Sequence, residues 1–71
     1  MINSNKIKGR MAELGITQKD VSKALDIAPP TVSQKINNVR PMDLNEAEEL
    51  ARILKILPSD FAEYFFSGSV A

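Results

Sequence analysis

The chain has 71 residues, a formal net charge of zero, and neither cysteine nor histidine. It can form no disulfide and no ordinary zinc site, and serine–histidine or cysteine–histidine catalysis is excluded, so we expect no enzyme and no cofactor. The length suits one domain over residues 1–71. With no secretory signal and no apolar stretch near the roughly 18 residues of a membrane span, we expect a cytoplasmic protein that does not associate with membranes.

Charge is distributed unevenly along the chain. Residues 1–40 carry seven basic and three acidic side chains, and residues 41–71 carry two basic and six acidic ones. Such a dipolar chain can present a positive end to nucleic-acid phosphates although it is neutral overall. The same charges are also compatible with ordinary solvated helix faces.

The first predicted helix starts near Asn3 or Ser4, both good caps, and ends at Gly15. A second helix follows Thr17, whose pairing with Asp20 three residues later is a variant of the capping box. Both helices have apolar residues at helical spacing. The first contributes Ile7, Met11 and Leu14, and the second Val21, Ala24 and Leu25.

A third helix is predicted from about Pro29 to Asn37, because proline suits a first helical turn. Asp26 lies where the chain must turn before this helix, and Asn38 can end it in the left-handed conformation. The helix presents Val32 and Ile36 inward, at i and i+4.

Two more helices complete an all-α fold, a bundle of five short helices. The fourth begins at Asp43, with Glu46 as its capping partner. The fifth begins at Pro58 and ends at Ser67 and Gly68. Their apolar faces consist of Ala47, Leu50, Ala51 and Leu54 in the fourth, and Phe61, Tyr64 and Phe65 in the fifth.

The segment from Thr17 to Asn38 is typical of a helix-turn-helix. Two helices separated by about three residues cross steeply, which requires a small residue where they approach, and Ser22 is suitably placed. Apolar residues lock the pair, namely Val21, Leu25, Ile27, Val32 and Ile36. Polar groups that can reach base edges are then left on the outer side of the third helix, namely Thr31, Ser33, Gln34 and Lys35.

Nearly the whole chain resembles the lambda-repressor-like family of phage Cro proteins, phage repressors and related bacterial regulators, also called the xenobiotic-response-element family. The matching segments are Thr17-Gln18, Thr31-Val32-Ser33-Gln34, Asn37-Asn38-Val39-Arg40-Pro41, Leu50-Ala51-Arg52-Ile53-Leu54 and Pro58. The resemblance implies a lambda-repressor-like bundle whose second and third helices form the helix-turn-helix. A chain this short looks most like a stand-alone phage Cro-type protein.

The resemblance also implies a sequence-specific transcriptional regulator that binds a palindromic double-stranded DNA operator through the major groove. Gln34 is then the main base reader, because an amide can bond adenine N6 and N7 together, and Thr31 and Ser33 assist it. The implied DNA-backbone contacts are Gln18, Lys19, Lys35, Asn37 and Arg40.

Several residues depart from the family pattern. Pro29 and Pro30 stand where members often have base-reading glutamines, and they can at best contact thymine methyl groups. Asp26 and Asn38 replace frequent glycines, and both can adopt positive φ at some cost. Two further departures are Lys55, where glycine is frequent, and Leu57, where a serine or aspartate cap is common.

Four aromatic residues within six positions exceed what one face of a short helix can bury. They are Phe61, Tyr64, Phe65 and Phe66. We expect part of this cluster to be exposed and to form a homodimer interface, at least on DNA, or a docking surface for a partner protein.

A second function stays open alongside DNA binding. The two prolines, Asp26 and the zero net charge are also compatible with a protein-binding helix-turn-helix module. Such a module acts as a modulator or anti-repressor that binds a repressor, or as an antitoxin that binds a toxin protein.

Overall fold

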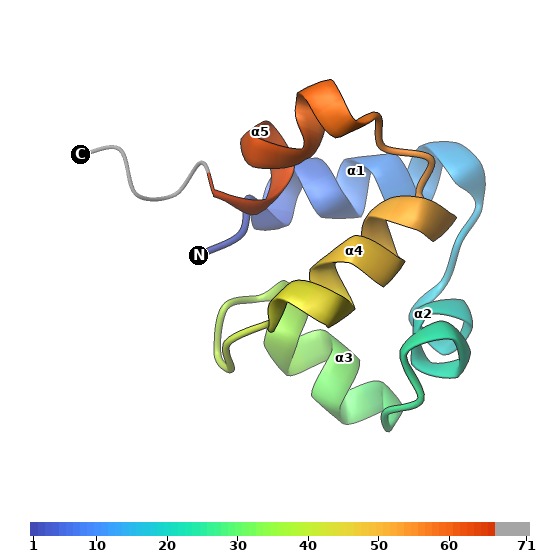
Figure 1. Cartoon of the computed structure of the whole chain (residues 1–71). Coiled ribbons are helices and arrows are strands. Elements are labelled where there is room, and N and C mark those ends of the chain that lie inside the picture. The colour runs from blue at the N-terminus through green and yellow to red at the C-terminus, as the bar shows by residue number, and fades with distance from the viewer. Residues whose placement is uncertain (67–71) are drawn as a thin grey trace.

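Helices follow one another along residues 1–66, the part of the chain that the computed structural model describes (Figure 1). They are α1 (Ser4–Leu14), α2 (Gln18–Leu25), α3 (Pro29–Ile36), α4 (Leu44–Ile53), the 3-10 turn η1 (Pro58–Asp60) and α5 (Phe61–Phe65). The predicted all-α fold of five short helices is confirmed. Ser67 and Gly68, the predicted end of the last helix, lie outside the described residues.

The helix starts follow from local hydrogen bonds. The side chain of Asn3 accepts from the Lys6 amide at 3.2 Å and caps α1. Both predicted capping boxes are complete, Thr17 with Asp20 in front of α2 and Asp43 with Glu46 in front of α4. In each box the side chain of the first residue accepts from the amide of the second, and the side chain of the second accepts from the amide of the first. Because these bonds join residues only three positions apart, the two helices begin where the sequence predicts.

A left-handed residue follows each of the helices α1 to α4. Gly15 follows α1 at φ 67°, and Asp26 follows α2 at φ 56°. Asn38 and Lys55 take φ 63° and 54° in the turns after α3 and α4. These angles confirm the prediction that Asp26 and Asn38 adopt positive φ. Glycine would be less strained at all three of the non-glycine positions.

The core takes an apolar stripe from every α-helix. Its least exposed large side chains are Ile7, Val21, Val32, Ile36, Leu50 and Leu54. Phe65 belongs to this core at 2% exposure, which confirms its place on the predicted apolar face of the fifth helix but removes it from the candidate dimer or partner surface. Its ring stacks on Phe61 with centroids 4.6 Å apart.

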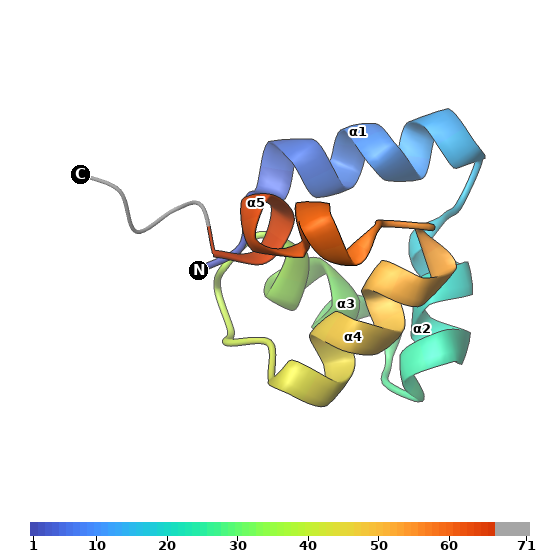
Figure 2. The ribbon, with the colours of Figure 1, turned by 45° about the horizontal axis from the view of Figure 1, so that its top comes forward.

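The helices form two parts that meet at the core, one made of α2, α3 and α4 and the other of α1 and α5. α2 packs against both α3 and α4, while α1 runs beside α5 and contacts α3 (Figures 1 and 2). The N-terminal segment joins the two parts, because the Asn3 amide donates to the Tyr64 carbonyl at 2.7 Å and Ile2 bonds to Asn38. No helix within residues 1–66 is long and apolar enough to cross a membrane.

Candidate nucleic-acid interface

The turn between α2 and α3 is fixed by Ser22. Its hydroxyl donates to the Ile27 carbonyl, and its own carbonyl accepts from the Ile27 amide at 3.2 Å. Ser22 is half-buried. The predicted small residue thus also makes a side-chain bond across the turn, so the angle between α2 and α3 is held by hydrogen bonds as well as by packing.

Opposite faces of α3 carry different chemistry. Val32 and Ile36 are each 1% exposed and face the core. Pro30, Gln34 and Asn37, at i, i+4 and i+7, lie on the opposite line and are exposed. This outer line is the surface that α3 offers to a binding partner.

Gln34 lies at the centre of the outer line. Its backbone carbonyl accepts from the amides of Val39 and Arg40 at 2.8 and 3.2 Å, which fixes the end of the helix. Its side-chain amide has no hydrogen-bond partner within residues 1–66 and is exposed. The group that the sequence singles out as a base reader is therefore available to do so.

The other predicted contact residues on α3 are more constrained than Gln34. Thr31 and Ser33 are half-buried and flank the outer line on its two sides. The Asn37 side chain donates to the Ser33 carbonyl at 2.9 Å and accepts from the Ser4 hydroxyl at 3.4 Å. Asn37 therefore links α3 to the start of α1.

Lys35 does not lie on the outer side of α3 as a free cation, and that expectation is wrong. Its amino group lies 2.5 Å from both carboxylate oxygens of Glu46 on α4. The two side chains are only 15% and 14% exposed. Lys35 follows Gln34 by one residue, or about 100° around the helix, so its side chain lies on the flank of α3 that faces α4. There the ion pair with Glu46 offsets the cost of removing both charges from water.

The start of α2 offers free backbone donors. Thr17 and Asp20 cap the helix, but the amides of Gln18 and Lys19 have no acceptor within the described chain, and both side chains are exposed. Amides at a helix N-terminus are suited to a phosphate group. The bonds from the Thr17 amide and hydroxyl to the Asp20 carboxylate hold the pKa of that carboxyl below its ordinary value.

Lys8 of α1 lies beside this helix start, and sequence reasoning missed it. It lines a shallow hollow of about 290 Å³ together with Gln18 of α2 and Ile36 of α3. Lys8 is exposed and has no ion-pair partner in residues 1–66. Because Lys8 directly follows the apolar Ile7 on the predicted first helix, the sequence could indicate that Lys8 is exposed. It could not indicate that Lys8 lies beside the start of α2, because that depends on how the helices pack.

Two other cations near the N-terminus serve the fold. Arg10 donates from Nε to the Leu54 carbonyl at 2.8 Å and from Nη2 to the Lys55 carbonyl at 3.3 Å, capping the end of α4. Lys6 pairs with Glu63 at 3.1 Å. The exposed cations without an ion-pair partner in residues 1–66 are Lys8, Lys19, Lys23, Arg40 and Lys55.

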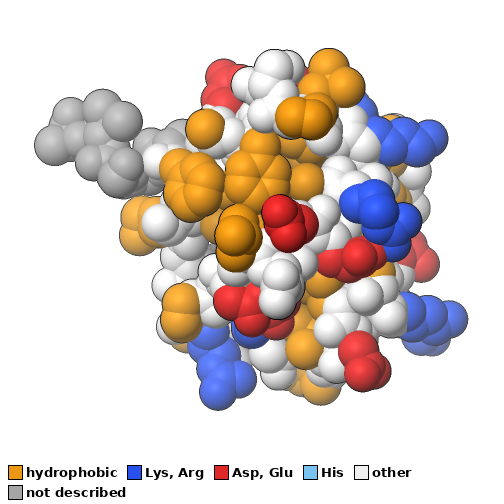
Figure 3. Space-filling view, viewed as in Figure 1, with side chains coloured by type: hydrophobic (Ala, Val, Ile, Leu, Met, Phe, Trp, Pro, Cys, Tyr) orange, Lys and Arg blue, Asp and Glu red, His pale blue; other side chains and the backbone are white. Residues whose placement is uncertain are grey.

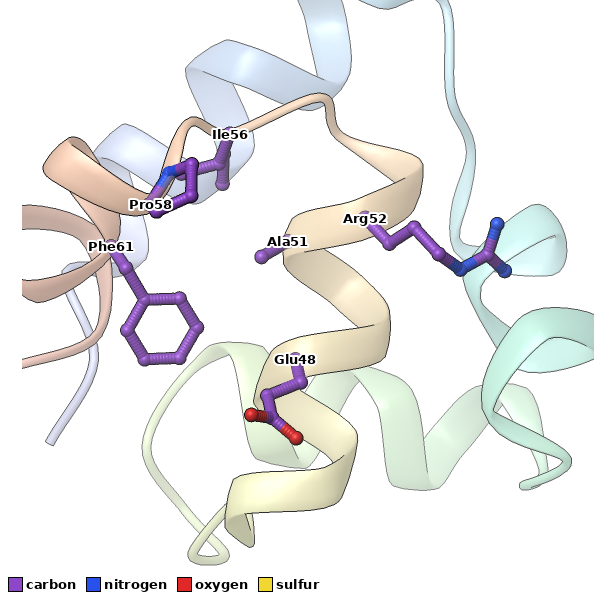
Figure 4. Close-up of a pocket in the computed structure, with 6 residues that line it drawn as sticks. All are labelled: Glu48, Ala51, Arg52, Ile56, Pro58 and Phe61. Atoms are coloured by element: carbon purple, nitrogen blue, oxygen red, sulfur yellow. The ribbon is translucent and has the colours of Figure 1, made fainter.

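The face formed by α4 and α5 has a different character. Acidic side chains lie over α4 and hydrophobic ones gather over α5 (Figure 3). A hollow of about 450 Å³ lies between these helices, where Phe61 and Pro58 face Ala51 and Arg52 points away toward α2 (Figure 4). This face is acidic and apolar, which disfavours contact with phosphates.

A hydrogen-bonded turn between two crossed helices and a polar outer line on the second helix together define a helix-turn-helix DNA-binding domain. A family model of the Cro/C1-type helix-turn-helix DNA-binding domain matches residues 6–67, and the chain belongs to this family. The resemblance drawn from the sequence is thus confirmed. A search among curated protein sequences finds no match to the chain.

Proposed function

We propose that the protein is a transcriptional regulator of the repressor type that inserts α3 into the major groove of a palindromic operator. The observation that carries this proposal is the Gln34 side chain, exposed and without a partner at the centre of the outer line of α3. An amide in this position can bond adenine N6 and N7 together. Occupation of the operator would exclude polymerase or a rival repressor.

Phosphate contacts on either side of Gln34 would fix the register of α3. Gln18 and Lys19 offer two backbone amides and a cation at the start of α2, and Lys8 adds a second cation beside them. Arg40 follows the other end of α3 and is exposed. These groups anchor the protein to the DNA backbone without reading sequence.

A homodimer would read the two halves of the palindrome. The hydrophobic surface near the end of α3 is the hollow of about 350 Å³ lined by Val39, Arg40 and Phe66, with Met1 beside them. Met1, Val39 and Phe66 are 72%, 70% and 55% exposed. The chain measures 31 × 23 × 20 Å, so two adjacent copies can approach the spacing of about 34 Å between successive major grooves.

Selection of tight binders from a pool of random duplex DNA tests the proposal. We expect one palindromic site, and we expect Gln34→Ala to weaken binding to it by about 1–3 kcal/mol while relaxing specificity at one base pair per half-site. The matched control is Gln18→Ala, which should weaken binding to all sequences alike. Equal affinity of the wild type for selected and random duplexes would contradict sequence-specific regulation.

One observation favours a second function, binding of a repressor or toxin protein. The first turn of α3 has no free backbone donor, because Pro29 and Pro30 lack N–H groups and the Thr31 amide bonds to Ala28 at 2.9 Å. If no duplex is enriched at low salt, and the protein co-purifies with the product of a neighbouring gene, this second function replaces the first.

A further inference from the structure

The first turn of α3 is an apolar surface at the point where the helix would enter the groove. Ala28, Pro29 and Pro30 are consecutive and exposed. The amides of Thr31 and Val32 both donate to the Ala28 carbonyl, at 2.9 and 3.1 Å. Since proline has no N–H, none of the residues Pro29 to Val32 has a backbone amide left to donate to a base or a phosphate.

Only one of the two prolines lies on the line of Gln34. Pro30 and Gln34 are related by i and i+4, which places their side chains side by side on the outer line. Pro29 is related to the buried Val32 and Ile36 by i+3 and i+7, so it lies on their side of α3 and not on the outer line, although it is itself exposed at the helix start. Pro30 is therefore the apolar side chain that lies next to the exposed side-chain amide of Gln34.

The chemistry of base edges decides what this proline ring can contact. In the major groove the thymine C5-methyl group is the apolar feature, while cytosine, guanine and adenine present donors and acceptors. A proline ring over those polar edges would remove them from water without bonding them, which costs free energy. Against a methyl group the same ring buries apolar surface at no such cost.

We propose that Pro30 packs on the C5-methyl group of a thymine that lies one or two base pairs away from the adenine that Gln34 reads. The proposal rests on the proposed function and deepens it, since it adds a methyl contact to the half-site. Four residues of α-helix advance about 6 Å, and stacked base pairs advance about 3.4 Å, which sets the limit of two pairs. Methyl recognition then compensates for the direct hydrogen bonds that prolines cannot make.

Deoxyuridine provides the test, because it lacks the methyl group but keeps the base pairing of thymine. Each thymine of the selected site is replaced in turn and affinity is measured by fluorescence anisotropy. We expect about fourfold weaker binding at one position per half-site, the equivalent of about 0.8 kcal/mol for one buried methyl group, and little change elsewhere. Pro30→Ser should bring the thymine-to-uracil affinity ratio at that position close to one, whereas Pro29→Ser should preserve it.

The ratio compares two DNA molecules on one protein, so a loss of stability in either variant cancels. Equal affinity for thymine and uracil at every position overturns the inference. A half-site with no thymine within two base pairs of the adenine that Gln34 reads also overturns it. So does a thymine-to-uracil affinity ratio that Pro30→Ser leaves unchanged. All three outcomes leave specific DNA binding intact, whereas failure to select any site overturns the proposed function and this inference together.

Discussion

The side chain of Asn38 pairs with both backbone groups of Ile2. Its Oδ1 atom accepts from the Ile2 amide at 2.9 Å, and its Nδ2 atom donates to the Ile2 carbonyl at 3.0 Å. Ile2 is 8% exposed and belongs to the core. Asn38 thus ends α3 in the left-handed conformation and also holds the N-terminal segment in place.

This double role predicts that one substitution has opposite effects at two left-handed positions. Asn38→Gly relieves the positive φ but loses both bonds to Ile2, so we expect a net destabilisation of about 1 kcal/mol. Asp26→Gly relieves a similar φ at an exposed residue whose carboxylate has no partner in residues 1–66, so we expect a gain of about 0.5–1 kcal/mol. Urea unfolding of both variants measures the difference, and a gain in both would disprove the structural role of the Asn38 side chain.

The starts of the helices could be predicted because their determinants are local. Thr17 with Asp20, and Asp43 with Glu46, are three residues apart, and proline restricts its own φ. The outer position of Gln34 followed equally from its spacing to the buried Val32. These parts of the fold and site need no knowledge of how the helices cross.

Contacts between helices could not be predicted in this way. Lys35 and Glu46 are 11 positions apart, and Arg10 and Leu54 are 44 apart, so their meeting depends on the packed angles of the helices. Phe65 and Phe66, by contrast, could be told apart from the sequence. Phe65 lies four residues after Phe61 on the predicted apolar face and is buried, whereas Phe66 lies outside that face and is exposed.

The ion pair between Lys35 and Glu46 should couple α3 to α4 more strongly than a surface pair would. In a double-mutant cycle with Lys35→Met and Glu46→Gln, we expect a coupling of about 1–2 kcal/mol, because the pair is largely buried. Glutamine keeps an acceptor for the Asp43 amide, so the cap is preserved. Arg52 and Glu49 are the control pair, where the 69% exposed arginine predicts a clearly weaker coupling, because water and salt screen the two charges. Similar couplings for both pairs would contradict the special position of Lys35.

Acid should weaken the start of α2 through Asp20. Its pKa is lowered chiefly by the hydrogen bond from the Thr17 backbone amide, and next by the Thr17 hydroxyl. Ionised Asp20 therefore stabilises the folded state fully above its unfolded pKa of about 3.9, and this contribution is lost as the pH falls through the lower folded value. NMR titration of the carboxyl should show that Thr17→Val raises the pKa only part of the way, since the backbone bond remains. Thr31→Val is the control without effect, and a wild-type pKa at or above the ordinary value would refute the cap.

Lys8 should contribute to DNA affinity without contributing to specificity. Lys8→Gln removes an exposed cation beside the start of α2, so we expect weaker binding to every duplex and a salt dependence reduced by about one phosphate contact. Lys55→Gln removes an exposed cation after the end of α4 and is the matched control. Affinities across a salt series measure both slopes, and equal slopes for wild type and Lys8→Gln would exclude Lys8 from the interface.

Phe66 should control self-association, because it is the most exposed member of the aromatic cluster and lines the hollow beside Val39 and Arg40. Phe66→Asp places a charge on this surface, and we expect sedimentation equilibrium to show a monomer where the wild type is a dimer, in solution or on an operator duplex. Leu57→Asp is the control, since Leu57 is 62% exposed, lies outside that hollow, and precedes η1 without a side-chain cap. Aspartate there should leave the dimer intact and stabilise the fold by about 0.5–1 kcal/mol as a new cap. A wild type that stays monomeric on a two-half-site duplex would rule out the homodimer, and a dimer that survives Phe66→Asp would place its interface elsewhere.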